Sequence, residues 1–96
     1  MAFVVSAKWR ANEGEAETIR EILAILTPLV RAEAGCLTYI AHQSVDDPRD
    51  FFLYEQFVDE AAFQAHAQAE HFKEHVLDRA VPLLETRERA LYTMLD

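Results

Sequence analysis

Two titratable side chains stand where the apolar pattern predicts a protein interior. His66 lies on the side of a predicted helix that also carries Phe63, and Glu55 lies in the middle of an aromatic-rich predicted strand. Histidine titrates close to neutral pH and could take a proton from an acidic phenol or enol. A carboxylate among apolar neighbours is costly unless it is paired or its pKa is raised. We take His66 and Glu55 as candidate catalytic residues. The structural alternatives are a hydrogen-bonded core histidine and an ion pair of Glu55 with Lys8, Arg87 or Arg89.

Aromatic side chains could form the wall of a pocket for a flat apolar ligand if they converge between helices and sheet. The alternative is that they only fill the core. The candidate pocket residues are Trp9, Tyr39, Tyr54, Phe63, Phe72 and His71, with Phe57 close by.

His71 and His75 are four residues apart, which places both imidazoles on one side of a helix at metal-ligand spacing. The segment reads HFKEH and not HExxH, so the carboxylate of a metalloprotease base is missing, and we expect no metal site. No phosphate-binding glycine loop or flavin fingerprint occurs in a chain with two glycines. We therefore expect chemistry without a bound cofactor.

The composition limits the class of protein. With 96 residues, 51% hydrophobic and 27% charged, the chain is predicted to form one domain, residues 1–96, whose small core makes oligomerisation plausible. The net charge of −8 disfavours nucleic acids and anionic membranes as partners. One cysteine, Cys36, and the lack of a long apolar segment predict a cytoplasmic protein with no membrane span.

The elements that must position these residues follow from periodicity. Strands are predicted over 2–10, 36–45, 51–58 and 84–95, and helices from Glu15 and over 60–77. We expect Gly35 as the C′ residue of the first helix, a kink or break near 24–27 caused by Pro28, and an irregularity at 69–71. Asp59 is predicted to cap the second helix. The order β-α-β-β-α-β predicts a ferredoxin-like α+β fold.

Both faces of the predicted sheet carry apolar residues, whereas two helices can cover only one face. Phe3 and Val5 alternate with Val4, and Leu53 alternates with Phe52 and Tyr54. A bare apolar face is an aggregation risk, so we expect a homodimer packed sheet to sheet. The alternative is a solvated face with scattered aromatic residues.

A family resemblance rests on residues 33–72, which read EAGCLTYIAHQSVDDPRDFFLYEQFVDEAAFQAHAQAEHF. Its specific parts are Gly35-Cys36-Leu37 with Tyr39, the Asp47-Pro48 turn, Tyr54-Glu55 before Phe57, the helix start from Asp59 to Phe63, and Ala65-His66 with His71-Phe72. The segment resembles the antibiotic biosynthesis monooxygenase domain family, and the similarity extends over nearly the whole chain. The resemblance implies a dimeric α/β barrel in which each subunit holds a pocket between helices and sheet.

Members that resemble this chain include quinol monooxygenases, and others oxidise anthrones without metal, flavin or nicotinamide. By position, His66 stands where some relatives have a tryptophan, and Ala62 and Phe72 replace the polar partners of anthrone oxygenases. The replacements at Ala62 and Phe72 argue against anthrone oxidation. Ala7 and Val76 replace the asparagine and axial histidine of haem-degrading relatives, which argues against haem degradation.

Three hypotheses follow. The first is a cofactor-independent monooxygenase that oxidises a quinol or related phenol with dioxygen, with His66 or Glu55 as base. The second is an isomerase of a small carbonyl compound that uses the same pair. The third is a non-catalytic ligand-binding or stress-associated dimer in which His66 and Glu55 are paired core groups.

Overall fold

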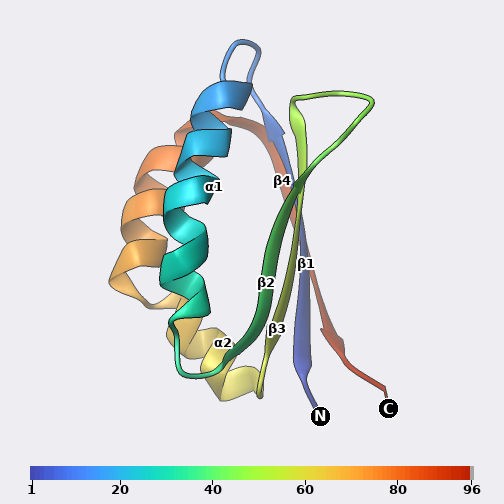
Figure 1. The fold of residues 1–96 in the computed structure, drawn as a ribbon, viewed down its shortest axis with the longest axis vertical. Helices are drawn as coiled ribbons and strands as arrows, with labels where there is room; N and C mark the ends of the chain where they lie inside the picture. The colour runs from blue at the N-terminus through green and yellow to red at the C-terminus, as the bar shows by residue number, and fades with distance from the viewer. Residues whose placement is uncertain (96) are drawn as a thin grey trace.

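The computed structural model describes residues 1–95 and places the helices on one face of a single sheet (Figure 1). The chain order is β1 (Phe3–Ala11), α1 (Ala16–Arg31), β2 (Cys36–Gln43), β3 (Asp50–Phe57), α2 (Glu60–Ala67), η1 (Phe72–Ala80), η2 (Val81–Leu83) and β4 (Leu84–Thr93). The predicted β-α-β-β-α-β order and ferredoxin-like α+β fold are confirmed.

The sheet is antiparallel throughout, with the strand order β2-β3-β1-β4. Its register decides which side chains meet the helices, because successive residues of a strand point to opposite faces. Val5 of β1 pairs with Glu55 of β3, and Tyr39 of β2 pairs with Glu55 from the other side. All three side chains are buried. Tyr54 pairs with Ser6 and therefore points away from the helices.

Helix α1 packs on the sheet through a stripe of apolar residues at helical spacing, namely Ile19, Ile22, Leu23, Leu26 and Val30. The helix is continuous from Ala16 through Pro28 to Arg31, so of the predicted kink or break the break is wrong. Pro28 has no backbone N–H and so makes no hydrogen bond to the preceding turn, but the helix continues. In the same turn, Thr27 Oγ1 donates a hydrogen bond to the carbonyl of Leu23 at 2.7 Å.

The prediction for Gly35 is wrong. The C-cap of α1 is Ala32, and Gly35 lies three residues later without a positive φ angle. Its hydrogen side chain is required for another reason, because a Cβ at this position would overlap the Cβ of Ala62 on α2. The absence of a side chain at Gly35 thus lets the turn after α1 approach α2.

The second helical region has two parts, as the predicted irregularity requires. Asp59 caps α2 as predicted, and its Oδ1 accepts a hydrogen bond from the backbone N–H of Ala62 at 2.9 Å. A turn at Gln68 and Ala69 separates α2 from η1, a π-helical segment that lies beside α1 (Figure 1). Among residues 1–95, no helix is long and apolar enough to cross a membrane.

The face of the sheet opposite the helices carries apolar side chains, as predicted, among polar ones such as Lys8 and Gln56. Its register positions include Val4, Phe52, Tyr54, Ile40 and Tyr92. Ile40 is 41% exposed and Tyr92 is 53% exposed in the single chain. Nothing within the described residues covers these two side chains.

Candidate active site

A small cavity lies between the second helical region and the sheet. Its walls include Trp9, Tyr39 and Glu55 from the strands, Phe63, His66 and Phe72 from the helical side, and Arg87 and Arg89 from β4. Its volume is about 30 Å³. This is enough for a water molecule but not for an aromatic ring, so a larger ligand requires wall side chains to move.

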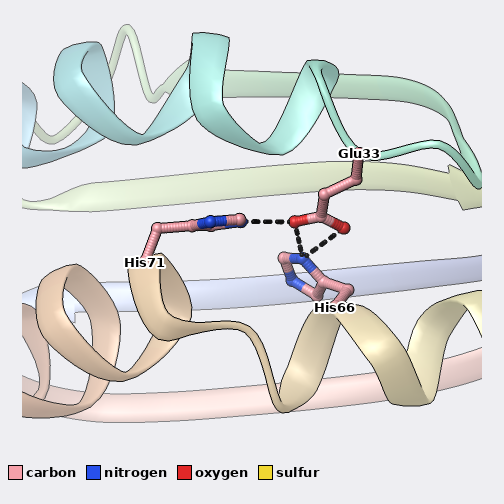
Figure 2. Close-up of side chains that lie close together, drawn as sticks. All are labelled: Glu33, His66 and His71. Carbon is pink, nitrogen blue, oxygen red and sulfur yellow. Dashed lines mark hydrogen bonds and ion pairs between the residues drawn. The ribbon is translucent and has the colours of Figure 1, made fainter.

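His66 and His71 both contact one carboxylate, that of Glu33 (Figure 2). His66 Nδ1 lies 2.8 Å from Glu33 Oε2 and 3.2 Å from Oε1, while His71 Nε2 lies 2.6 Å from Oε2. The His66 side chain is 4% exposed and that of Glu33 is 15% exposed. Direct hydrogen bonds of this kind to a buried imidazole fix its orientation.

The shared carboxylate determines the tautomer of His66. An ionised carboxylate has only acceptor atoms, so the histidine must donate its Nδ1–H to Glu33. In the neutral imidazole, Nε2 then carries the free lone pair. Nε2 lies 3.6 Å from Glu55 Oε1, too far for a hydrogen bond, and both atoms belong to residues that line the cavity. His66 is thus held as a base with its acceptor nitrogen toward the cavity.

Burial shifts the pKa values of Glu55 and His66 in opposite directions. It raises the pKa of Glu55 to about 7, and the nearby charge of Glu33 adds to the increase. It lowers the pKa of His66, although the hydrogen bond to Glu33 acts against this decrease. At neutral pH a substantial fraction of Glu55 is therefore protonated while His66 is mainly neutral, which is an acid and a base side by side.

Aromatic rings surround the imidazole of His66. Its ring centroid lies 5.0 Å from that of Phe57, 5.1 Å from that of Phe72 and 6.5 Å from that of Tyr39. The Phe72 ring meets the imidazole nearly perpendicularly, at 71°. These apolar neighbours produce the desolvation that shifts both pKa values, and they offer a flat ligand an apolar wall.

The local structure explains why these side chains meet. In an uninterrupted α-helix, residues five apart point about 140° away from each other. The turn between α2 and η1 changes this direction, so His66 and His71 converge on one carboxylate (Figure 2). Glu33 lies in the turn after α1, which approaches α2 at Gly35. The broken helix and the close turn together assemble the triad.

The structure brings Trp9, Tyr39, Phe63 and Phe72 to the cavity with Glu55 and His66, whereas Tyr54 lies on the opposite face of the sheet. Tyr54 is therefore separated from the predicted pocket by the alternation of side chains along β3. There its hydroxyl accepts a hydrogen bond from Gln56 Nε2 at 2.8 Å.

The two further histidine predictions have different outcomes. His71 contacts Glu33 and lies behind His66, outside the cavity wall. His75 is buried and accepts a hydrogen bond from Arg79 Nη1 at 3.3 Å, and it lies apart from the other histidines of the site. The residues able to hold a metal ion are instead Glu33, His66 and His71, whose ligand atoms lie within 4.8 Å of one another. A metal ion there would have to replace the protons in the hydrogen bonds of His66 and His71 to Glu33.

Glu55 has no basic partner within ion-pair distance among residues 1–95 apart from His66, so the alternative of an ion pair with Lys8, Arg87 or Arg89 is wrong. Lys8 points to the other face of the sheet, opposite Glu88. Arg87 and Arg89 act on the pKa of Glu55 only through space, and each lowers it. The buried carboxyl is thus left without a neutralising contact.

A comparison with known families decides the classification. Residues 2–77 match the model of the antibiotic biosynthesis monooxygenase family. The chain belongs to this family. The matched part includes Glu33, Glu55, His66 and His71, whereas β4 with its two arginines lies beyond it.

Solved structures share the fold of the chain. The chain is 33% identical to PA3566 from Pseudomonas aeruginosa, with a TM-score of 0.90 over 99% of this chain and 95% of that one. It is 35% identical to SO0527 from Shewanella oneidensis, with a TM-score of 0.88 and coverage of 95% and 88%. Rv0793 from Mycobacterium tuberculosis is 22% identical with a TM-score of 0.91, over 100% of this chain and 97% of that one, and shares the fold. Among curated proteins, no sequence matches this one.

Proposed function

We propose that this member of the family is a cofactor-independent monooxygenase that oxidises a quinol or a related electron-rich phenol with dioxygen. The observation that carries the proposal is the hydrogen bond from His66 Nδ1 to Glu33, which leaves Nε2 as a buried base beside Glu55. The aromatic wall around His66 suits a phenolic ring. Membership of a monooxygenase family supports the reaction class.

The protein's part in this reaction is to remove a proton and hold the resulting anion. His66 Nε2 accepts the phenolic proton, and the Glu33 carboxylate stabilises the imidazolium that forms. Glu55, with a pKa of about 7, is the group that donates a proton to oxygen later in the cycle. The sequence leaves open which of the two is the base, and the free Nε2 of His66 favours the histidine.

The electrons come from the substrate. The quinolate gives one electron to dioxygen, and the semiquinone and superoxide combine to form a carbon–oxygen bond at the ring. Cleavage of the O–O bond of this hydroperoxide releases water, with a proton from the protein, and leaves a hydroxyquinone. A hydroquinone and one dioxygen thus become a hydroxyquinone and one water, with no other reductant. Orientation of the two reactants and stabilisation of the anion are what the cavity has to supply.

A second candidate reaction is isomerisation of a small carbonyl compound. The observation in its favour is the pair itself, because an acid and a base 3.6 Å apart can move a proton between two positions of one enol. Such a reaction consumes no oxygen. The aromatic wall of the cavity makes this the less favoured candidate.

The decisive experiment is oxygen uptake by metal-stripped protein with a panel of hydroquinones and anthrones. We expect uptake above autoxidation, and a decrease in kcat/KM of about 10² to 10⁴ in His66→Gln, the range typical of a lost general base. Glu33→Gln, which keeps the shape but not the charge of the orienting group, should reduce kcat/KM less. The control is His42→Gln, because His42 lies on the opposite face of the sheet.

Each result has a definite meaning. Uptake that is unchanged in His66→Gln would overturn the assignment of the base. Absence of uptake across the panel would reject the monooxygenase, and anaerobic turnover of enolisable carbonyl compounds would then identify the isomerase. Absence of both activities would leave a ligand-binding protein in which His66 and Glu55 are core groups.

We also propose that two copies of the chain pair through the apolar face of the sheet. The support is the exposure of Ile40 and Tyr92 beside Val4 and Phe52 on a face that the helices leave bare. Light scattering after size exclusion should give twice the chain mass. Ile40→Asp with Tyr92→Asp should reduce it to one chain, whereas Leu29→Asp on α1, outside the sheet face, should not. A single-chain mass for the unmodified protein would refute the pairing.

A further inference from the structure

Arg87 and Arg89 stand at the mouth of the cavity. Arg87 pairs with Trp9 and Arg89 pairs with Ala7, so both side chains point to the face of the sheet that carries the helices. Strand β4 is at the edge of the sheet, and both arginines are exposed on one side while they line the cavity on the other. The Cζ atom of Arg89 lies 5.2 Å from the ring centroid of Phe63.

Neither guanidinium has a carboxylate within ion-pair distance in the part of the chain that the structure describes. Among the other arginines, Arg10, Arg20 and Arg49 contact carboxylates, whereas Arg31 donates to the carbonyl of Tyr39 and Arg79 donates to His75. Arg10 contacts Asp47, Asp50 and Glu85, and Arg49 contacts Glu85. Glu88, which lies between the two arginines in sequence, pairs with Lys8 in register and so points to the opposite face. Arg87 and Arg89 differ from Arg31 and Arg79 because they lie on the same face of β4 and line one cavity, where a single anion from outside can contact both.

The surroundings of the pair strengthen this argument. Burial and the neighbouring charge of Arg89 lower the pKa of Arg87, and the charge of Glu55 acts through space against this decrease. The two cations thus destabilise each other. An anion between them would relieve the repulsion and accept charge-assisted hydrogen bonds. Arginine suits this role because its planar guanidinium binds a carboxylate through two parallel N–H donors.

The geometry points to a substrate that carries a carboxylate: Arg87 and Arg89 hold that group at the mouth while the phenolic hydroxyl reaches His66. The substrate class is therefore a hydroxylated aromatic acid. The identity of the phenol rests on the proposed function, whereas the preference for a carboxylate rests on the arginines alone. Because the closed cavity is too small for a ring, the exposed arginine side chains must turn outward, and a carboxylate would hold them there.

The test compares ligands that differ only in charge, under anaerobic conditions so that no turnover occurs. The probes are 2,5-dihydroxybenzoate and its methyl ester, with hydroquinone as the unsubstituted ring. Trp9 is the single tryptophan and lines the cavity, so its fluorescence reports occupancy directly. We expect the unmodified protein to bind the acid at least about tenfold more tightly than the ester, with a ratio that falls as salt is added.

Substitution of the arginines should remove this preference. In Arg87→Gln with Arg89→Gln the ratio should approach one, while the affinity for the ester changes little. Arg87→Lys should retain part of the preference, because the positive charge remains but the bidentate hydrogen bonding to a carboxylate is lost. The control is Arg20→Gln, since Arg20 is exposed on α1 and its nearest carboxylate is Glu17 at 3.9 Å.

Failure of this inference is distinguishable from failure of the proposed function. A ratio near one in the unmodified protein, or a ratio that survives in the double variant, would overturn the role of the arginines whatever the oxygen-uptake result. His66→Gln should keep the carboxylate preference even though it loses turnover. Far-ultraviolet circular dichroism of each variant shows whether it has folded. Both arginines are exposed on an edge strand, so we expect their substitution to leave the fold intact.

Discussion

Replacement of the buried acid Glu55 by glutamine should stabilise the protein above neutral pH. Glu55 is 5% exposed, and burial raises its pKa from 4.5 to about 7. Below pH 4.5 the carboxyl is protonated in both the folded and the unfolded chain and folding carries no penalty. As the pH rises from 4.5 to about 7, the unfolded chain ionises freely and the folded chain resists, so the free energy of unfolding decreases.

The size of the effect follows from the two pKa values. At about 1.4 kcal/mol for each tenfold change in proton affinity, the ionised carboxylate costs about 3 kcal/mol in the folded state. Glu55→Gln keeps the size of the side chain and removes this cost. The free energy of unfolding should therefore increase by up to about 3 kcal/mol at pH 8.5 and change little at pH 4.5.

Urea denaturation at fixed protein concentration, between pH 4.5 and 8.5, measures this difference. Glu21→Gln is the matched control, because Glu21 is exposed on α1 and its substitution removes one negative charge without releasing a buried one. If Glu55→Gln has the same effect at every pH, the carboxyl is not destabilised by burial and the acid–base pair proposed for the site is wrong.

Four further outcomes test the fold and the site. Gly35→Ala should destabilise the protein by about 1 to 3 kcal/mol, because its Cβ overlaps that of Ala62, and Ala62→Gly should restore part of the loss in thermal denaturation. Asp59→Ala should cost about 1 kcal/mol in urea denaturation through loss of the cap on α2. With an active substrate, log kcat/KM should rise with pH with its midpoint below the ordinary histidine value of 6.5, since burial lowers the pKa of His66; a rise above pH 8 would argue for another base. Tyr54→Phe should leave kcat/KM within about twofold, and a larger loss would place Tyr54 in the reaction after all.

The fold was predictable because its determinants are local. The apolar stripe of α1, the cap at Asp59 and the strand patterns each specify their own segment. The local pattern also predicts that His66 and Glu55 are buried, since each is a polar residue among apolar neighbours. Their mutual distance of 3.6 Å depends on tertiary packing, which no single segment encodes.

Glu33 escaped prediction for a physical reason. It lies just beyond a helix end, where an acidic residue is ordinarily solvated, and no periodicity marks it as buried. Its partner His66 is 33 residues away, and contact depends on the tight approach of the turn at Gly35 to α2. The position of Gly35 after a helical pattern predicts a helix cap, which is not the role that it has in the fold. The useful signal was the absence of a side chain at a close contact between elements.

The order of the strands in the sheet also constrains how the chain acquires its shape during synthesis. Strand β1 is made first, yet it lies between β3 and β4, and β4 is made last. One edge of β1 therefore stays unpaired until residues 84–93 have been translated, and pairing of such distant segments is slow. A nascent chain that stalls before β4 exposes this edge to other chains, a known route to aggregation. Translation speed through the last strand thus becomes a determinant of yield, and the same strand closes the mouth of the cavity.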